Sequence, residues 1–390
     1  MDREILQKLE RNRRETTQWF EHLHRHPELS MREENTAQFL ASLLRGWGYR
    51  VETGIGKYGL VASLKSGGSS RSLGLRADFD ALPIQEINEL PYQSTRAGVS
   101  HLCGHDGHSA MLLAAGKYLA ETRNFDGTVR LIFQPGEETM EGGPAMIRDG
   151  LFERFPVDAV FGMHNMPGLE AGKLYFADGE VMAAVDNWEI ELSGKGSHGS
   201  MPELGIDPIV AGSSLVMALQ SIVARNVAPS HSAVVTVGAF RAGTAGNAVA
   251  HAATLRLSIR TKTTADRELV LERIRTLTRH QAESYGCTSR ISEGVPGAVL
   301  VNRPEETRKA YEIAKEAFGA EQVVYPGPTY MGSEDFAFML QQKPGTYCFI
   351  GNGDTPMVHH PEYVFNREIL TKGAAYWVAL TEGYLHGSGL

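Results

Sequence analysis

The sequence predicts an α/β protein in two parts, a mostly parallel-sheet domain covered by helices and an inserted ferredoxin-like α+β domain. Nearly continuous apolar strands alternate with helical segments up to about residue 182, which is typical of a parallel sheet with helices on its faces. Beyond that point, strands with alternating apolar residues and two long helices follow in the order of a ferredoxin-like sandwich. The length of 390 residues also suits two domains.

The elements of the first part follow from apolar spacing and from residues that break structure. Apolar residues recur at helical spacing from Ile5 to Leu23, and Pro27 is expected to end that helix. Segments rich in apolar or β-branched residues and bounded by glycine or serine are expected to be strands. The elements expected next are helices over 33–47, 107–121 and 145–152, and strands over 49–55, 60–65, 72–78, 127–135 and 157–165.

The second part is expected to be a smaller unit that buries its own core. Asp207 is a suitable N-cap for its first helix, and Pro208 suits the first helical position. Its expected elements are strands over 187–194, 232–243, 248–261 and 288–295, and helices over 207–225 and 265–286.

These elements set the expected domain boundaries. Residues 183–298 are predicted to form the inserted domain, and residues 1–182 and 299–390 the domain that carries it. After the insertion, the chain is expected to return with a helix over 303–318, a strand over 346–353 and a final helix over 373–385.

Composition and charge narrow the class of protein. The formal net charge is −8 and no basic stripe stands out, so we expect no nucleic-acid partner. The N-terminus is amphipathic without an apolar signal-peptide core, and no apolar run approaches transmembrane length, so we expect no membrane partner. Cys103, Cys287 and Cys348 are too few and too scattered for a disulfide framework. Reduced thiols in a cytoplasmic protein fit best, which leaves Cys103 available as a thiolate ligand.

Metal-binding side chains occur at the ends of the expected core strands. Open α/β sheets bind ligands at the carboxyl ends of their strands. Thiolate, imidazole and carboxylate groups together suit Zn²⁺ or a similar divalent ion. Of two adjacent glutamates, one could bind the cation while the other takes a proton from water. The residues at such places are Asp78, Asp80, Cys103, His105, Glu137, Glu138, His164, His359 and His360.

Taken singly, each cluster also has a structural explanation. The sequence PGEE is typical of a solvated turn, and aspartates at strand ends are common in turns. A histidine in a buried strand, such as His164, is often a hydrogen-bonded core residue. Only the joint occurrence at successive strand ends favours a metal site.

His22, His24 and His26 have a spacing that does not converge on one helix face, so we expect them at a solvated helix end.

Six motifs reveal a family resemblance that spans the whole chain. HLCGHDGHSAMLL, FQPGEE, GMHNMPG, GKGSHGSMPELGIDPI, GSEDFAFML and VHHPEYVFN occur in the order found in the M20 metallopeptidases. More narrowly, the chain resembles the branch of aminoacylases, hippurate hydrolases and auxin-conjugate amidohydrolases. The resemblance implies a catalytic domain that binds two divalent metal ions per subunit. The metal is expected to be Zn²⁺, Mn²⁺ or Co²⁺. It also implies a lid domain that mediates homodimerisation.

The resemblance implies a role for each matching residue. Glu137 is similar to the family's general base, and Asp78 to an aspartate that orients a ligand. His198 resembles a lid histidine that reaches the substrate carbonyl, often across the dimer. Asn247 and Arg260 lie where lid residues contact substrate.

His359 is preferred to His360 because the family's ligand lies two residues before a proline, here Pro361. The metal ligands implied by position are Cys103, His105, Glu138, His164 and His359.

The chain departs from the family pattern at three places. Glu203 replaces a histidine that usually follows the lid motif. The usual sequence GTxR is here LSIR, which ends at Arg260. Val364 replaces an aspartate. These changes affect the expected substrate preference more than the chemistry, because Glu137, His198 and all five implied ligands are present.

The activity implied is hydrolysis of small-molecule N-acyl amino acids to a carboxylic acid and a free amino acid. The alternatives are an M20-type dipeptidase or carboxypeptidase, for which Glu203 could anchor the ammonium group of a peptide, and a non-enzymatic metal- or ligand-binding protein. Glu137 argues against the latter, because a structural site needs no spare carboxylate. A phosphate-binding enzyme is a further alternative, but the glycine-rich SGKGSHG lacks the P-loop spacing.

Overall fold

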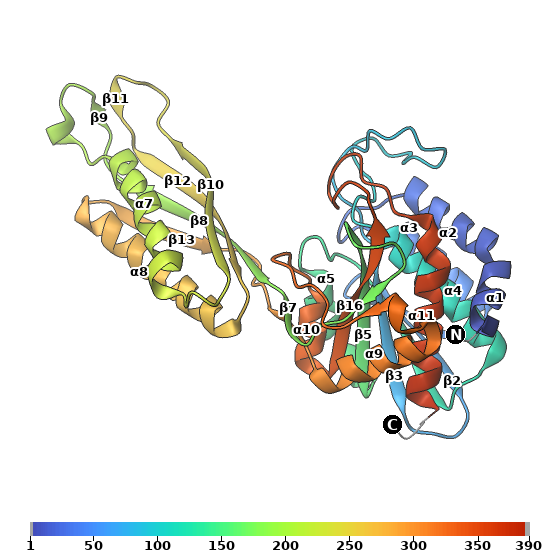
Figure 1. Cartoon of the computed structure of the whole chain (residues 1–390). Coiled ribbons are helices and arrows are strands. Elements are labelled where there is room, and N and C mark those ends of the chain that lie inside the picture. Colours follow the sequence, from blue (N-terminus) through green and yellow to red (C-terminus); the bar gives the residue numbers. More distant parts are fainter. Residues whose placement is uncertain (1–2, 387–390) are drawn as a thin grey trace. The chain divides into compact units, whose positions relative to one another are not determined.

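The chain folds into two compact units, which the computed structural model describes over residues 3–386 (Figure 1). The large unit comprises the chain up to Val181, Val301–Thr329 and the chain from Asp335 on. The small unit comprises Met182–Leu300 and Tyr330–Glu334, and the predicted insertion over 183–298 lies inside it. Each unit has a hydrophobic core of its own.

The large unit is built on an eight-stranded sheet with the order β1-β2-β4-β3-β5-β16-β6-β15. The central strands β4, β3, β5 and β16 run parallel, whereas β2 is antiparallel to both of its neighbours. β3 and β5 are buried at every residue, as expected for strands with both faces covered. The strands are β1 (Arg50–Ile55), β2 (Gly59–Ser66), β3 (Ser72–Asp78), β4 (Gly127–Gln134), β5 (Ala159–Pro167), β6 (Leu174–Tyr175), β15 (Val323–Val324) and β16 (Gly345–Gly353).

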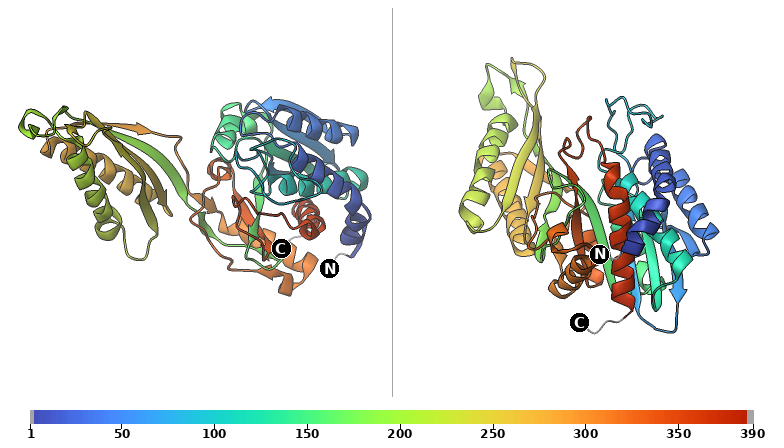
Figure 2. Two further views of the ribbon diagram at one scale, coloured as in Figure 1. Left: turned by 90° about the horizontal axis from the view of Figure 1, so that it is seen from above. Right: turned by 45° about the vertical axis from the view of Figure 1, so that its right-hand side comes forward.

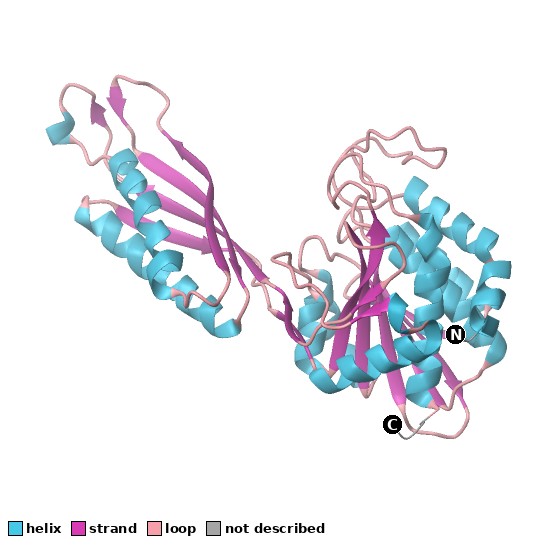
Figure 3. Ribbon diagram, in the orientation of Figure 1, coloured by secondary structure: helices cyan, strands magenta, loops and turns pink. Residues whose placement is uncertain are grey.

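Helices cover both faces of this sheet (Figure 1, Figure 3). α4 packs on β3 and beside α11, and α1 and α2 pack outside these two helices, whereas α5 and α10 lie on the opposite face. α4 is buried around nearly its whole circumference, because it lies between the sheet and outer helices. The helices are α1 (Arg3–Arg11), α2 (Arg13–Arg25), α3 (Glu34–Gly46), α4 (His105–Thr122), α5 (Gly142–Arg148), α6 (Leu151–Arg154), α9 (Pro304–Phe318), α10 (Phe336–Gln342) and α11 (Leu370–Leu385).

The small unit is a four-stranded antiparallel sheet, ordered β10-β12-β8-β13, with two helices packed on one face (Figure 2). Asp207 caps the first helix by accepting a hydrogen bond from the backbone N–H of Ile209. A short ribbon of β9 (Ser197–His198) and β11 (Ala248–Val249) completes the unit. Its main elements are β8 (Ala184–Ser193), α7 (Pro208–Asn226), β10 (Ala233–Ala242), β12 (Ala252–Thr261), α8 (Thr264–Ser284) and β13 (Thr288–Glu293). The predicted fold class, a mostly parallel α/β domain with a ferredoxin-like insertion, is confirmed.

Several boundaries differ from the sequence prediction. The first predicted helix is divided at Asn12 into α1 and α2, and the helical segment near 145–152 is divided at Gly150, where φ is 79°. The strand predicted over 248–261 is interrupted after Val249. α4 begins at His105 instead of Gly107, so His105 lies on the helix and not before it.

One helix, α7, is long and apolar enough to cross a membrane by length and composition alone. Its mean hydropathy is 1.3 over 18 residues of Pro208–Asn226, so the statement that no apolar run approaches transmembrane length is wrong for this segment. Its residues Ala211, Leu215, Leu219 and Ile222 are buried in the core of the small unit. Core helices of soluble proteins pass the same test of composition, so α7 is weak evidence for a membrane span.

Candidate metal centre

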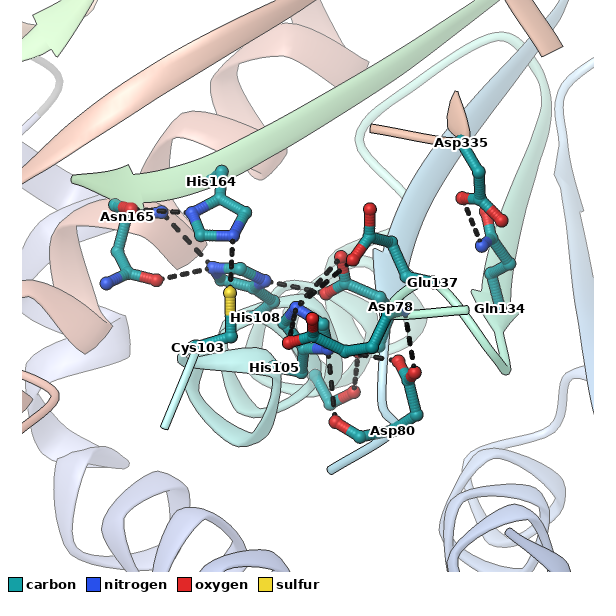
Figure 4. A network of polar contacts seen from close by, with 12 residues as sticks. Asp78, Asp80, Cys103, His105, His108, Gln134, Glu137, His164, Asn165 and Asp335 are labelled. Atoms are coloured by element: carbon teal, nitrogen blue, oxygen red, sulfur yellow. Dashed lines mark hydrogen bonds and ion pairs between the residues drawn. The ribbon is translucent and has the colours of Figure 1, made fainter. Parts of the chain in front are cut away.

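The carboxyl ends of three parallel strands and the start of α4 meet at one place in the large unit (Figure 4). Asp78 ends β3, Glu137 and Glu138 follow β4, and His164 lies within β5, three residues before its end. These side chains are buried or nearly so. The strand-end pattern that the sequence shows therefore corresponds to one cluster of side chains.

Two glycines shape the turns that present the candidate ligands. Gly104, directly before α4, has φ +99°, and a Cβ there would overlap the amide oxygen of Asn165. Gly136, directly before Glu137, has φ +60°, and a Cβ there would lie 2.6 Å from the sulfur of Met31. Both positions require glycine because L-residues rarely adopt positive φ and because neighbouring atoms fill the space.

His105 presents one ring nitrogen to the centre. Its Nδ1 donates to the backbone oxygen of Asp80 at 3.1 Å and to the Asp80 carboxylate at 3.0 Å. Its Nε2 is fully buried and has no hydrogen-bond partner among residues 3–386. Carboxylate oxygens of Asp78, Glu137 and Glu138 lie 3.7, 4.0 and 3.9 Å from this nitrogen, which is too far for hydrogen bonds. A cation between these atoms would satisfy all of them.

Cys103 and His164 face each other beside His105. The Sγ of Cys103 lies 3.3 Å from Nε2 of His164. The other ring nitrogen, Nδ1, donates to the backbone oxygen of Asn165 at 2.5 Å. Because a carbonyl oxygen only accepts, His164 carries its proton on Nδ1 and turns the lone pair of Nε2 toward the thiol.

Glu138 and His359 complete the cluster. Nε2 of His359 lies 3.3 Å from one oxygen of Glu138, and the other oxygen of Glu138 is buried without a hydrogen-bond partner in the described part of the chain. His359 has φ +70°, an uncommon conformation for a residue with a Cβ, and its N–H donates to the backbone oxygen of Leu102 at 2.7 Å. His359 and His360 are both exposed, but the ring of His360 accepts a hydrogen bond from the N–H of Glu362.

Burial and neighbouring charges shift the pKa values of three groups in the cluster, those of Cys103, His164 and Asp78. Burial and the charge of Glu138 raise the pKa of the Cys103 thiol well above its usual range. Burial also lowers the pKa of His164 well below its usual range, so the ring is neutral and able to ligate. For Asp78, burial raises the pKa, but the charges of His105 and Arg76 outweigh burial and hold the pKa well below its usual value.

The donor set fits divalent cations. The ligand atoms of Cys103, His105 and His164 lie within 4.8 Å of one another, and so do those of Cys103, Glu138 and His359. Sulfur, imidazole nitrogen and carboxylate oxygen in such groups are the ligands of zinc and related metals. The unpartnered buried atoms of His105 and Glu138 agree with this fit, because buried polar atoms are normally satisfied.

A buried network that the sequence analysis did not assign lies behind the cluster. Arg76 donates to Gln134, Asp78 and Asp335 at 2.9, 2.7 and 3.1 Å. His108 donates through Nδ1 to Asp78 at 2.6 Å. The sequence signal for His108 was its position one turn after His105 on the same helix, but nothing in the spacing indicated Asp78 as its partner.

Three residues of the small unit were implied as substrate contacts, and they lie at two places. His198 lies on β9 and pairs with Ala248 of β11, and Asn247 directly precedes β11. Arg260 lies near the other end of β12, eight residues from Ala252, or about 27 Å at the rise of a strand. There it donates to the backbone oxygen of Met331 at 2.8 Å, beside the junction with the large unit.

The sequence analysis places His22, His24 and His26 at a solvated helix end, and this prediction holds for only two of them. His22 and His26 are exposed, but His24 is only 3% exposed. Its ring nitrogens lie 2.7 Å from Asp106 and 3.0 Å from Glu86. The prediction for His24 is wrong because helical spacing defines faces but not which face a later segment covers.

An α/β domain whose strand ends gather thiol, imidazole and carboxylate ligands beside a further carboxylate has the arrangement of a metal-dependent hydrolase. The model of peptidase family M20/M25/M40 matches residues 74–383 of this chain. The chain therefore belongs to this family, which confirms the resemblance and the prediction that the protein is a hydrolase.

Relatives of known name support the narrower branch. The chain is 45% identical over 363 residues to a hippurate hydrolase of Campylobacter jejuni, covering 93% of this chain and 94% of the relative. It is 35% identical to an N-acetyl-L-cysteine deacetylase of Bacillus subtilis, covering 91% and 84%. Among solved structures, a dinuclear metal binding peptidase of the M20 family from Bacillus subtilis is similar, with a TM-score of 0.82, 31% identity and coverage of 98% and 99%.

Proposed function

We propose that this protein hydrolyses the amide bond of N-acyl amino acids to a carboxylic acid and an amino acid. The observation that carries the proposal is the buried Nε2 of His105, which faces three carboxylates and lies in one group with Cys103 and His164. The names of the hippurate hydrolase and the deacetylase support the acylated amino acid as the substrate class.

Two divalent cations would be held by the five side chains of Cys103, His105, Glu138, His164 and His359. Cys103 belongs to both of these groups of ligand atoms, so it would be one of the residues that hold the cations. When bound, such cations lower the pKa of a water molecule and polarise the amide carbonyl. A thiolate favours Zn²⁺, while Mn²⁺ and Co²⁺ remain in the proposal because supply also selects the metal.

The chain's own residues supply the remaining chemistry. Glu137 adjoins the ligand Glu138 and is 7% exposed, so it can accept a proton from the attacking water and return it to the departing nitrogen. Nδ1 of His198 accepts a hydrogen bond from the N–H of Ser200 at 3.2 Å, which leaves the proton of a neutral ring on Nε2. His198 can therefore donate from Nε2 to the oxygen of the amide as negative charge develops there.

The role of the remaining predicted residues is part of the proposal. Asp78 would orient the centre through its contact with His108 and its place near His105. Arg260 would bind the carboxylate of the amino acid after giving up its contact with Met331, and Asn247 would act beside His198.

We also propose a cytoplasmic homodimer formed through an inserted lid domain over 183–298. α7 and β10 expose apolar side chains on the small unit, with Met217 72%, Val210 50% and Val234 41% exposed. His198 lies at the end of this unit that is remote from its junctions, which agrees with a role toward the substrate of a partner subunit. The three cysteines are free, as in a reducing compartment.

Hydrolysis of N-benzoylglycine and N-acetyl amino acids, measured with Zn²⁺ or Mn²⁺ added back after chelation, tests the proposed function. Cleavage that chelator abolishes and metal restores is the expected result. If the matching dipeptide is cleaved and the acylated amino acid is not, the protein is a dipeptidase instead. Glu203 is the observation that favours this second candidate, because its exposed carboxylate follows His198 and could bind an ammonium group.

A further inference from the structure

Two large apolar side chains of the large unit are mostly exposed to solvent. Ile87 is 60% exposed and Met357 is 56% exposed, more than any other large apolar side chain of this unit within residues 3–386. Their neighbours in the chain Ile84, Leu90 and Val358 are packed against the hydrophobic core instead. Two apolar side chains left outside a core that their neighbours join are candidates for contact with a ligand.

The loops that carry these two residues meet at one end of the large sheet. The loop of Ile87 follows β3 and the loop of Met357 follows β16, and both strands run parallel to β5 (Figure 1). The backbone N–H of Ile87 donates to the backbone oxygen of Pro361 at 3.1 Å. The side-chain amide of Asn88 donates to the backbone oxygen of Tyr363 at 3.1 Å. These hydrogen bonds join the two loops.

The same loops lie at the exposed side of the candidate metal centre. The side chain of His359 is 49% exposed, whereas that of Glu138 is nearly buried and the other three candidate ligands are buried. Solvent therefore reaches the centre beside His359. Met357 lies two residues before His359, and Ile87 is hydrogen-bonded to Pro361, two residues after it. Both apolar residues therefore belong to the loops at this entrance.

The substrate class of the proposed function has an apolar part that the polar ligand atoms cannot bind. We propose that Ile87 and Met357, here called the apolar rim, bind the acyl group and favour a bulky acyl group such as benzoyl over acetyl. A larger acyl group removes more apolar surface from water when it contacts the rim, so the preference should increase with its size. This inference rests on the proposed function, because the acyl group is part of that substrate.

The test compares N-benzoylglycine with N-acetylglycine as substrates of wild type, Ile87→Ala, Met357→Ala and the double variant. The two substrates differ only in the acyl group, so the ratio of their kcat/KM values isolates its contribution. Wild type should favour N-benzoylglycine, and the ratio should fall about 10-fold in the double variant, the lower end of the range for lost apolar contacts in a binding site. A wild type without this preference, or an unchanged ratio in the double variant, would overturn the proposal.

Val301→Ala is the matched control. Val301 is 38% exposed on β14 (Leu300–Asn302), and the N–H of Arg303 donates to the backbone oxygen of Gly345, where β16 begins. Val301 therefore lies near the end of β16 opposite to the rim, and its variant should keep the wild-type ratio. An equal fall in this variant would show that the ratio does not report the rim, and the proposal would fail.

Calorimetry of benzoate and acetate binding to the Zn²⁺-loaded protein gives a reading that needs no turnover. Benzoate should bind more tightly than acetate, and the double variant should lose about 10-fold of this difference. If wild type shows the difference but cleaves neither acylated amino acid, the proposed function fails and the rim is still supported. If wild type cleaves both and the double variant changes neither the ratio nor the binding, the rim fails and the proposed function stands.

Discussion

Glu137 and Glu138 are consecutive residues whose side chains have different surroundings. An oxygen of Glu138 lies 3.3 Å from His359, whereas Glu137 lies 4.0 Å from Nε2 of His105. Both side chains are nearly buried and belong to a turn that begins at a glycine with positive φ. Their proposed roles, Glu138 as a ligand and Glu137 as a base, therefore depend on the direction of each side chain and not on burial.

Replacing Glu137 by glutamine should remove the base without removing a ligand. We expect kcat to fall about 10²–10⁴-fold, the usual contribution of a general acid–base group, with cation content unchanged. Rates and metal content of Glu137→Gln measured together check this. Glu141→Gln, an exposed glutamate four residues on, should behave as wild type. Near-normal turnover of Glu137→Gln would remove Glu137 from the role.

The two adjacent histidines near the C-terminus should differ in their effect on cation binding. His359 approaches Glu138 with a backbone held at positive φ, while the ring of His360 contacts the N–H of Glu362. His359→Ala should lose one of two bound cations, and His360→Ala should retain both. Elemental analysis of the two purified variants gives the answer, and equal loss in both would contradict the assignment.

At the scale of elements, a buried histidine connects α2, the first turn of α4 and the loop after β3. His24 lies on α2, Asp106 on α4 and Glu86 in the loop, and the N–H of Ser94 in the same loop donates to Glu86. The start of α4 carries His105, so this contact fixes the helix end from which a ligand projects.

The pH dependence of stability should report this contact. Burial lowers the pKa of His24, but hydrogen bonds to Asp106 and Glu86 outweigh burial and raise the pKa to about 9, from 6.5. The stabilisation is fully present below pH 6.5 and is lost as the pH rises through 9. His24→Gln should therefore cost on the order of 3 kcal/mol of unfolding free energy at pH 6 and much less at pH 10.

Denaturant unfolding of the cation-free wild type and His24→Gln from pH 6 to 10 provides the measurement. The other titratable rings near His24 do not share this range: burial lowers the pKa of His101 to about 4 and raises the pKa of Tyr92. A difference between the two proteins that stays constant across the range would show that the charge of His24 contributes nothing.

At the scale of the whole molecule, two separate cores should respond separately to cations. Among the described residues, the hydrophobic cluster around α4 and α11 in the large unit includes none from 182–300, and the cluster under α7 and α8 in the small unit lies entirely within that range. All five candidate ligands belong to the large unit. A cation bound by these residues should therefore stabilise the large unit and not the small one.

Calorimetry with and without Zn²⁺ should reveal this separation. At a free Zn²⁺ concentration of 100 times Kd, the unfolding free energy of the large unit should rise by about 2.7 kcal/mol per site. The unfolding temperature of the small unit should not change. Chelation should reverse the shift. A single transition that moves as a whole would show that the two units unfold together.

Much of the fold was predictable because it depends on near neighbours in the chain. Strand and helix periods, the cap at Asp207 and the apolar core strands are local features, and they predicted both the parallel sheet and the ferredoxin-like order. The boundaries that were missed, at Asn12, Gly150 and His105, are places where packing overrides local preference.

The sequence by itself determined which kinds of ligand were present and that they follow successive strands, because a parallel sheet brings its strand ends to one edge. Only the tertiary structure decided that Nε2 of His105 faces the candidate metal centre, that Asp80 contacts two candidate ligands, and that His24 is buried. It also decided that Arg260 and His198 lie at different ends of the small unit. These contacts join residues far apart in the chain, and their geometry is set by packing that no short-range pattern records.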